Sequence, residues 1–217
     1  MLSILIASSK GGAGKTTLAT TLASSFAVAG RNTVLVDTDR QASALRWADR
    51  RATGFHPVLG LPGLRRDWPR QVPADAERVV VDSPAGIRVT DIAPWLDTID
   101  VVLVPVLPSV VDLEASEPFL AELAAVPPIR DGRIRVGLVA NRLKPWTNAS
   151  RLAVEAMAAL PFPLVAEVRD TQGYVLAHAV GRGLFDYQAG SVRTHQEDWR
   201  PLLRWIERPA RRSPGPR

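Results

Sequence analysis

The sequence predicts an α/β protein built on a doubly wound, mostly parallel sheet with helices on both faces. Short apolar runs alternate with helical patterns from one end of the 217-residue chain to the other. Several runs, such as VVLVPV, are continuously apolar, which is typical of strands buried on both faces of a parallel sheet. The repeated order of strand and helix is the pattern from which doubly wound sheets are built.

The elements can be placed along the chain from these runs. The predicted strands are residues 2–7, 33–37, 78–82, 101–106, 134–140 and 164–168. The predicted helices, where apolar residues recur at helical spacing, are residues 15–29, 41–51, 88–97, 112–124, 148–159 and 171–180, with a last helix at 191–207. Residues 52–77 interrupt the rhythm with several Pro and Gly, so a short edge strand near 55–60 and one irregular helix are expected there. We expect one domain over residues 1–207 and a disordered, basic tail at 208–217.

Composition excludes several classes of protein. There is no cysteine, which removes disulfides, thiolate metal sites and iron–sulfur clusters. No apolar run has the length of a membrane span, and no signal peptide pattern is present, so we expect a cytoplasmic protein. The net charge of +5 is compatible with loose contact to nucleic acid, but it is also common in proteins that never touch DNA.

The segment SSKGGAGKTT (residues 8–17), here called the phosphate loop, follows the first strand and opens the first helix. Glycines let its backbone turn and bring N–H groups toward phosphate oxygens, and the helix N-terminus adds partial positive charge. Lys15 is expected to reach the β- and γ-phosphates, and the Thr16 hydroxyl to ligate Mg²⁺. The loop predicts a fold of the P-loop NTPase type that binds a nucleotide together with Mg²⁺. The expected nucleotide-binding residues here are Gly11, Gly12, Ala13, Gly14, Lys15, Thr16 and Thr17.

Carboxylates end two neighbouring strands of the predicted sheet. Asp82 closes the run RVVVD, and Asp37 and Asp39 follow the run TVLV. Such carboxylates can hold the water shell of a metal or position the attacking water near the γ-phosphate. For one of Asp37 and Asp39, capping of the next helix is an equally good interpretation.

Lysine usage points to a second functional cation. Among 27 basic residues the lysines number three, Lys10, Lys15 and Lys144, and two of them share the phosphate loop. Lys10 could hardly reach its own γ-phosphate around Lys15. A cation delivered to the phosphates of a partner would stabilise the charge that develops in phosphoryl transfer. The alternative is a solvated surface lysine.

The motifs SKGGAGKTT, VDTDRQAS and VVVDSPAG together resemble the deviant Walker A family of partition ATPases, to which ParA and Soj belong, with MinD and the nitrogenase iron protein as more distant relatives. The resemblance covers about residues 1–185. It implies a homodimer in the ATP-bound state, in which Lys10 touches the phosphates of the other subunit. It further implies that Lys15 and Thr16 bind phosphate and Mg²⁺, with Asp37 and Asp82 supporting the water shell of the metal. Asp39 would position the hydrolytic water. Asn141 would contact adenine. Arg40 departs from the family, which usually has proline there.

Within that family the small ParA type fits best, since only nine residues precede Lys10 and no N-terminal DNA-reading domain is expected. The resemblance implies a slow ATPase that is stimulated by DNA and a partner protein. It also implies that the protein is nucleoid-associated and positions a cargo, which could be a plasmid, a chromosome or a protein assembly. The expected partners are non-specific DNA and a ParB-like or other cargo adaptor. The basic residues suited to phosphate contact are Arg169, Arg182, Arg193, Arg200, Arg204, Arg208, Arg211 and Arg212.

Three other functions stay open. A MinD-like membrane switch would use an amphipathic C-terminal helix, but the stripe of Trp199, Leu202, Leu203 and Ile206 is interpreted as core packing, and membrane binding is not expected. The second alternative is a metabolic ligase of the dethiobiotin synthetase kind, which would need a pocket for a small substrate. The third alternative is an ATP-dependent adaptor protein with negligible ATP turnover. For Trp68, Trp95 and Trp146, core positions are favoured over an interface.

Overall fold

The computed structural model describes residues 1–51, 54–65 and 67–208. In that part of the chain seven strands form one sheet in the order β3-β2-β4-β1-β5-β6-β7. Every neighbouring pair runs parallel, so the sheet is parallel throughout and the predicted doubly wound fold is confirmed. The strands are β1 (Leu2–Ile6), β2 (Thr33–Asp37), β3 (Leu59–Pro62), β4 (Arg78–Asp82), β5 (Val101–Val106), β6 (Arg135–Leu143) and β7 (Leu164–Arg169).

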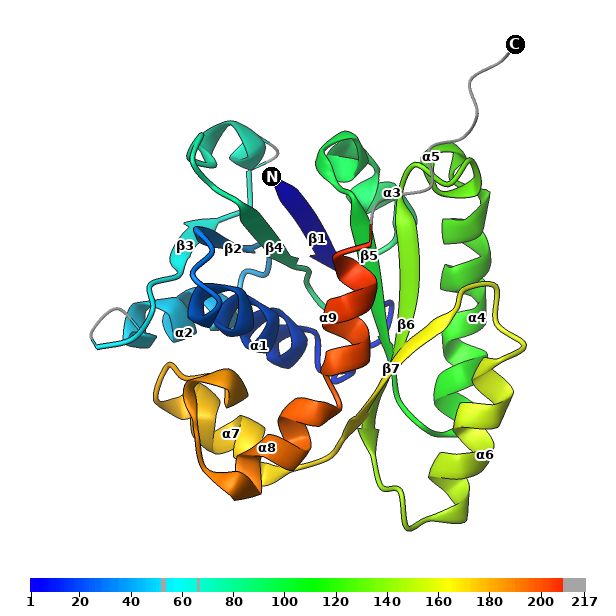
Figure 1. Ribbon diagram of the computed structural model, residues 1–217. Helices are drawn as coiled ribbons and strands as arrows, with labels where there is room; N and C mark the ends of the chain where they lie inside the picture. Colours follow the sequence, from blue (N-terminus) through cyan, green and yellow to red (C-terminus); the bar gives the residue numbers. More distant parts are fainter. Residues whose placement is uncertain (52–53, 66, 209–217) are drawn as a thin grey trace.

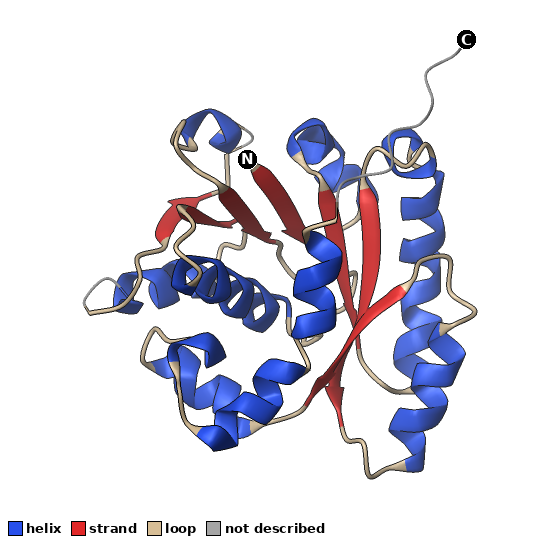
Figure 2. Ribbon diagram, viewed as in Figure 1, coloured by secondary structure: helices blue, strands red, loops and turns tan. Residues whose placement is uncertain are grey.

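Helices cover both faces of this sheet (Figures 1 and 2). The α-helices are α1 (Lys15–Val28), α2 (Ser43–Arg51), α3 (Val89–Ile92), α4 (Val110–Ala125), α5 (Pro127–Arg130), α6 (Asn148–Met157), α7 (Gln172–Ala179), α8 (Gly190–Glu197) and α9 (Arg200–Ile206). The described residues also contain three 3₁₀ turns, η1 (Trp68–Gln71), η2 (Ala93–Thr98) and η3 (Leu184–Asp186).

Successive strand residues feed two separate cores. Leu5 of β1 belongs to the core under α4 and α6, whereas Ile4 and Ile6 belong to the core under α1, α2 and α9. This division follows from the alternation of side chains along a strand. It is the reason that the strands read as continuous apolar runs, because both faces are buried.

The helices expected at 88–97 and 191–207 are each divided, which corrects the prediction. Pro94 lies in the first turn of η2 and Pro201 in the first turn of α9. Proline has no N–H to donate to the preceding turn, so a new element begins at each position. The edge strand β3 lies a few residues later than expected, at Leu59–Pro62. Of the predicted tail, residues 209–217 lie outside the described residues.

The tryptophans divide between core and surface. Trp68 and Trp95 are buried against each other, with ring centroids 6.3 Å apart, as predicted. The prediction is wrong for Trp146, which is 77% exposed, because it lies in the turn beyond the end of β6, where no helix covers it. The C-terminal stripe is confirmed as packing, since Trp199, Leu202 and Ile206 are all buried.

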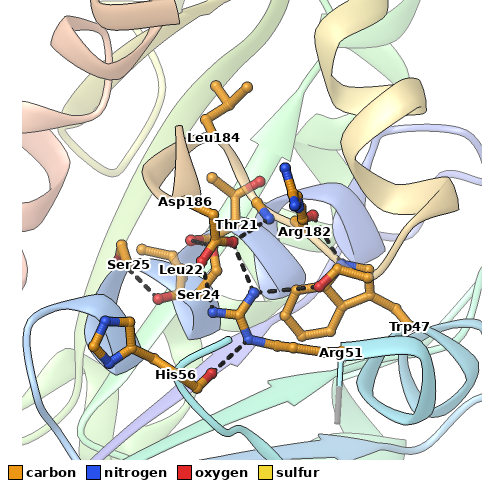
Figure 3. Close-up of polar contacts among 12 residues, drawn as sticks. Thr21, Leu22, Ser24, Ser25, Trp47, Arg51, His56, Arg182, Leu184 and Asp186 are labelled. Atoms are coloured by element: carbon orange, nitrogen blue, oxygen red, sulfur yellow. Dashed lines mark hydrogen bonds and ion pairs between the residues drawn. The ribbon is translucent and has the colours of Figure 1, made fainter. Parts of the chain in front are cut away.

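A buried ion pair fastens the loop after α7 to the end of α2. Figure 3 shows Arg51 and Asp186 facing each other, with the guanidinium nitrogens 2.7 and 2.8 Å from the two carboxylate oxygens. Arg51 also donates to the carbonyl oxygens of His56 and Gly181. Both charged groups therefore have partners although they are buried, and the segment that carries α7 is held against α1 and α2.

Candidate nucleotide-binding site

The phosphate loop lies at the carboxyl edge of the sheet, directly after β1. Gly12 and Gly14 have φ angles of 75° and 90°, a region that side-chain-bearing residues rarely adopt. Gly14 is the N-cap of α1, and no side chain caps the first turn of this helix. The N–H groups of that turn are thus left as donors at the positive end of a helix, which fits the binding of phosphate.

Lys15 folds back into the loop. Its Nζ is 3.0 Å from the carbonyl oxygen of Lys10 and 3.5 Å from that of Ser8. Burial lowers the pKa of Lys15, while the carboxylates of Asp82 and Asp39 raise it in opposition. The ammonium therefore lies inside the loop, where the phosphates of a nucleotide would meet it.

Asp82 and Thr16 form the base of the site. The Thr16 hydroxyl donates to Asp82 Oδ2 at 2.7 Å, because β4 pairs with β1 and brings Asp82 level with Ile6. Asp82 Oδ1 is buried and has no hydrogen-bond partner among the described residues. Burial raises the pKa of Asp82 to about 7, reinforced by Asp37 and Asp39 and opposed by Thr16 and Lys15.

These residues fit Mg²⁺ bound together with a nucleotide. The Thr16 hydroxyl and the unpartnered Asp82 oxygen are hard oxygen donors of the kind that Mg²⁺ or its water shell takes. Within the described residues no cluster of three or more acidic or histidine side chains could hold a metal alone. The ion would thus depend on phosphate oxygens and water for its other ligands, which is usual for Mg²⁺.

Asp37 acts as the cap of α2. Its Oδ2 accepts from the backbone N–H groups of Ala44 and Leu45 at 2.8 and 3.1 Å, and its Oδ1 accepts from the N–H of Asp39 at 2.9 Å. Of the two interpretations offered for this carboxylate, helix capping is thus the one realised in its hydrogen bonds. Its role toward a metal stays a prediction, exerted through its charge next to Asp82.

Asp39 follows Asp37 by two residues, beyond the end of β2, and is half-buried. Its Oδ1 accepts from the N–H of Gln41 at 2.9 Å, and its charge acts on both Lys15 and Asp82. Arg40 beside it is exposed. Asp39 is therefore close enough to the phosphate loop for a role in positioning water, and that role stays a prediction.

Asn141, in β6, contacts the phosphate loop through its side chain. Its Nδ2 donates to the carbonyl oxygen of Ala13 at 2.7 Å, and the side chain is buried. The next residue, Arg142, has a φ of 58°, and the pairing of β6 with β7 shifts register between Ala140 and Leu143. At this irregularity Asn141 is buried and Arg142 is exposed. Contact of this residue with adenine stays a prediction.

A pocket of about 550 Å³ adjoins the loop and continues the site away from the phosphates. Its walls come from α1, the end of β6, the end of β7 and α7. The lining residues include Thr16, Thr17, Asn141, Arg142, Tyr174 and His178. The position and size suit a nucleoside next to bound phosphates. Sequence reasoning missed Arg142, Tyr174 and His178, since nothing in their spacing relates them to the loop.

The Lys10 side chain contacts another element, whereas that of Lys15 contacts the loop itself. The Nζ of Lys10 contacts Asp112 Oδ1 in the first turn of α4, a pairing across 102 positions of sequence. Sequence reasoning did not single out Asp112. A signal existed, because Ser109-Val-Val-Asp112 has the spacing of a helix N-cap and follows a strand that ends at the same edge.

The basic residues expected to contact DNA differ in their surroundings. Arg169 is bound to Asp198, with Nη2 and Oδ1 2.8 Å apart, and Arg182 stacks over Phe55 and Tyr187. Arg200 pairs with Glu197 at the surface. Arg193, Arg204 and Arg208 are exposed and form no ion pair within the described part of the chain. Arg211 and Arg212 lie outside it.

The fold and the loop together define a P-loop nucleotide-binding protein. Residues 4–184 match the family described as the CobQ/CobB/MinD/ParA nucleotide binding domain, and the chain belongs to this family. The matched family is one of nucleotide-binding domains, and the matched residues include the whole phosphate loop. Within the described residues, no helix is both long and apolar enough to cross a bilayer.

One relative matches most of the chain and a second matches about half of it. The chain is 29% identical to maintenance of carboxysome distribution protein A of Halothiobacillus neapolitanus, over 87% of this chain and 88% of that protein. It is 33% identical to the protein of the same name from Gloeobacter kilaueensis, over 51% of each.

Solved structures share the fold at low identity. The MinD cell division protein of Aquifex aeolicus has a TM-score of 0.72 at 21% identity, covering 98% of this chain and all of that one. The apo McdA structure from Cyanothece has a TM-score of 0.71 at 16% identity, covering 94% and 99%. These likenesses confirm the fold.

Proposed function

We propose that this chain is an ATP-gated dimerising switch of the ParA type that positions a protein assembly within the cell. One observation carries the proposal: the two lysines of the phosphate loop diverge. Lys15 turns inward onto the carbonyl oxygens of the loop, while Lys10 extends outward to α4. These contacts support a role for Lys15 toward the phosphates of its own subunit and for Lys10, once it leaves Asp112, toward those of another.

The residues of the site divide the chemistry between them. The N–H groups of the phosphate loop and Lys15 would bind the phosphates, and Thr16 and Asp82 would hold the Mg²⁺ shell. Asp39 would orient the attacking water. Mg²⁺ supplies charge neutralisation on the phosphates when bound. Lys10 of a second subunit would then add positive charge where negative charge develops in the transition state.

The proposed cargo is a protein assembly in preference to a plasmid or a chromosome. The similarity to maintenance of carboxysome distribution protein A of Halothiobacillus neapolitanus extends over nearly the full length of both proteins, which supports this choice. The partner would accordingly be an adaptor on the assembly rather than a centromere-binding ParB-like protein. Hydrolysis would be slow until that adaptor and DNA engage the dimer.

We further propose that the ATP-bound dimer binds DNA non-specifically and uses the nucleoid as its track. Arg193, Arg204 and Arg208 support this, since their guanidinium groups are exposed and unpaired within the described residues. Contacts to phosphate alone carry no sequence information and weaken with salt. A membrane track is less well supported because Leu202 and Ile206 of α9 are buried, and Leu203 and Trp205 pack partly buried against the same core.

The test is retention of the ATP-bound protein on duplex DNA and, separately, on anionic liposomes, together with ATP hydrolysis across a salt series. We expect ATP-dependent retention on DNA whose logarithmic salt slope flattens by up to about 0.9 for each phosphate-contacting arginine replaced by alanine. Lys15→Ala is the control for dependence on ATP. Retention on liposomes and not on DNA would support the MinD-like alternative and overturn the DNA track.

A further inference from the structure

The ion pair between Lys10 and Asp112 has a defined place in the site. It joins the phosphate loop to the first turn of α4, and the side chains are 35% and 17% exposed. Within the described residues no other ion pair includes a lysine. The cation that the proposed function assigns to a second subunit is therefore bound by a carboxylate of its own chain.

The Asp112 side chain is a fixed acceptor. Its Oδ2 accepts from the Ser109 hydroxyl, and the Ser109 oxygen in turn accepts from the backbone N–H of Asp112 at 3.2 Å. Ser109 is the N-cap of α4, a helix of 16 residues, and the positive end of such a helix favours a carboxylate in its first turn. Asp112 is thus held independently of Lys10.

The Lys10 backbone is also fixed, but its side chain is not otherwise restrained. Its carbonyl oxygen accepts from Lys15, and its N–H donates to the Ser8 hydroxyl at 3.3 Å. Only the side chain can therefore move without disturbing the loop. The neighbouring residues Val110 and Val111 are 65% and 69% exposed, so the ion pair lies at an open, apolar part of the surface.

We propose that Asp112 is a positioning residue that restrains Lys10 in its own subunit and so raises the ATP occupancy or protein concentration needed for dimerisation. The proposal rests on the proposed function above. To reach the phosphates of a second subunit, the Lys10 ammonium must leave Asp112. The same ion pair opens in both subunits, so its contribution counts twice in the dimer equilibrium.

The size of the effect follows from the exposure of the pair. A partly exposed ion pair changes an equilibrium by a factor of about 2 to 5, and two such pairs by about 4 to 25. Asp112→Asn keeps the shape of the side chain and removes its charge. Glu114→Gln is the matched control, because Glu114 is an exposed acid of the same helix that is not bound to Lys10.

The first measurement tests the restraint without nucleotide. The chain has three lysines, so acylation by an N-hydroxysuccinimide ester followed by peptide mass spectrometry reports Lys10 individually, with exposed Lys144 as internal reference. We expect Lys10 to react several-fold faster relative to Lys144 in Asp112→Asn than in the wild type or Glu114→Gln. Equal rates in all three proteins would overturn the proposal.

The second measurement is dimerisation with a non-hydrolysable ATP analogue and Mg²⁺, followed by sedimentation velocity. We expect Asp112→Asn to dimerise at about 4- to 25-fold lower protein concentration than the wild type, with Glu114→Gln unchanged. Weaker dimerisation would show that Asp112 aligns Lys10 instead of restraining it, and unchanged dimerisation would show that the ion pair does not affect the dimer. Either result would overturn the proposal. If acylation changes as expected but no protein dimerises with ATP, the proposed function fails while the restraint on Lys10 stands. Should Asp112→Asn not fold, Asp112→Ser, which is also suited to the first turn of a helix, undergoes the same two measurements.

Discussion

A Cβ atom placed on Gly14 would lie 2.3 Å from Nδ2 of Asn141, so the glycine and the asparagine occupy adjoining space that admits no side chain on the loop. Asn141 uses the same nitrogen to hold the carbonyl oxygen of Ala13 at 2.7 Å. The close approach binds the end of β6 to the phosphate loop. The loop thus needs Gly14 both for its φ of 90° and for this contact.

We expect Gly14→Ala to lower ATP affinity by at least tenfold and to destabilise the fold by about 1–3 kcal/mol, from backbone strain plus displacement of Asn141. Gly30→Ala is the matched control, because Gly30 also has a positive φ, 77°, but no atom lies within 4 Å of its Cβ position. That variant should lose about 1 kcal/mol and keep its ATP affinity. Calorimetric titration and urea unfolding measure the two quantities. Equal affinities for the two variants would contradict the role given to the Gly14–Asn141 contact.

The two lysines of the phosphate loop should separate binding from dimerisation. We expect Lys15→Ala to weaken ATP binding by about 100-fold, since it removes a charged hydrogen bond to phosphate. Lys10→Ala should leave the affinity of the monomer within about threefold and abolish the ATP-dependent dimer. Lys144→Ala is the control for loss of a lysine elsewhere. A Lys10→Ala protein that still dimerises with ATP would rule out the role across subunits.

Asp39→Ala should trap the ATP-bound dimer. The substitution removes the carboxylate proposed to orient the attacking water, while Lys15, Thr16 and Asp82 keep their contacts. We expect hydrolysis to fall by at least tenfold and the dimer to persist for hours in ATP and Mg²⁺, as sized by chromatography. Rapid return to monomer would show that Asp39 does not serve hydrolysis.

The raised pKa of Asp82 predicts how stability depends on pH. The pKa rises from an ordinary 3.8 to about 7 in the folded protein, chiefly through burial. The folded state thus favours the protonated carboxyl, and its stabilising contribution is complete below the unfolded pKa and lost as the pH rises through 7. We expect the free energy of unfolding without nucleotide to fall between pH 4 and 7, by at most about 1.4 kcal/mol per pH unit.

Asp82→Asn should remove this slope, because an amide does not titrate in that range. Urea unfolding at several pH values, with Asp97→Asn as the control for an exposed carboxylate, measures the difference. An Asp82→Asn protein with the same slope as the wild type would refute the assignment.

The buried ion pair of Arg51 and Asp186 should matter far more to stability than exposed pairs do. We expect Asp186→Asn to cost about 3–5 kcal/mol, because it leaves the fully buried guanidinium without its charged partner. Asp97→Asn, which removes the partner of the exposed Arg133, should cost less than about 1 kcal/mol. Similar losses in urea unfolding would show that the buried pair does not fasten the loop after α7 as proposed.

Much of the fold could be predicted because parallel strands buried on both faces have a local signature. The runs at 33–37, 78–82 and 101–106 coincide with β2, β4 and β5 to the residue. The errors fell where the local pattern is ambiguous. An apolar stripe continues across Pro201, so one helix was predicted where the structure has α8 and α9. Trp146 was predicted to be in the core from its residue type alone.

By itself the sequence determined the parallel sheet, the phosphate loop with its two lysines and the carboxylates at the strand ends, since each depends on residues adjacent in the chain. Only the tertiary structure decided how those groups are used. It directed Asp37 to the N–H groups of α2, left an oxygen of Asp82 without a partner among the described residues, and brought Lys10 to Asp112. These contacts join residues as much as 102 positions apart. They follow from the strand order and register of the sheet, which no local pattern of residues encodes.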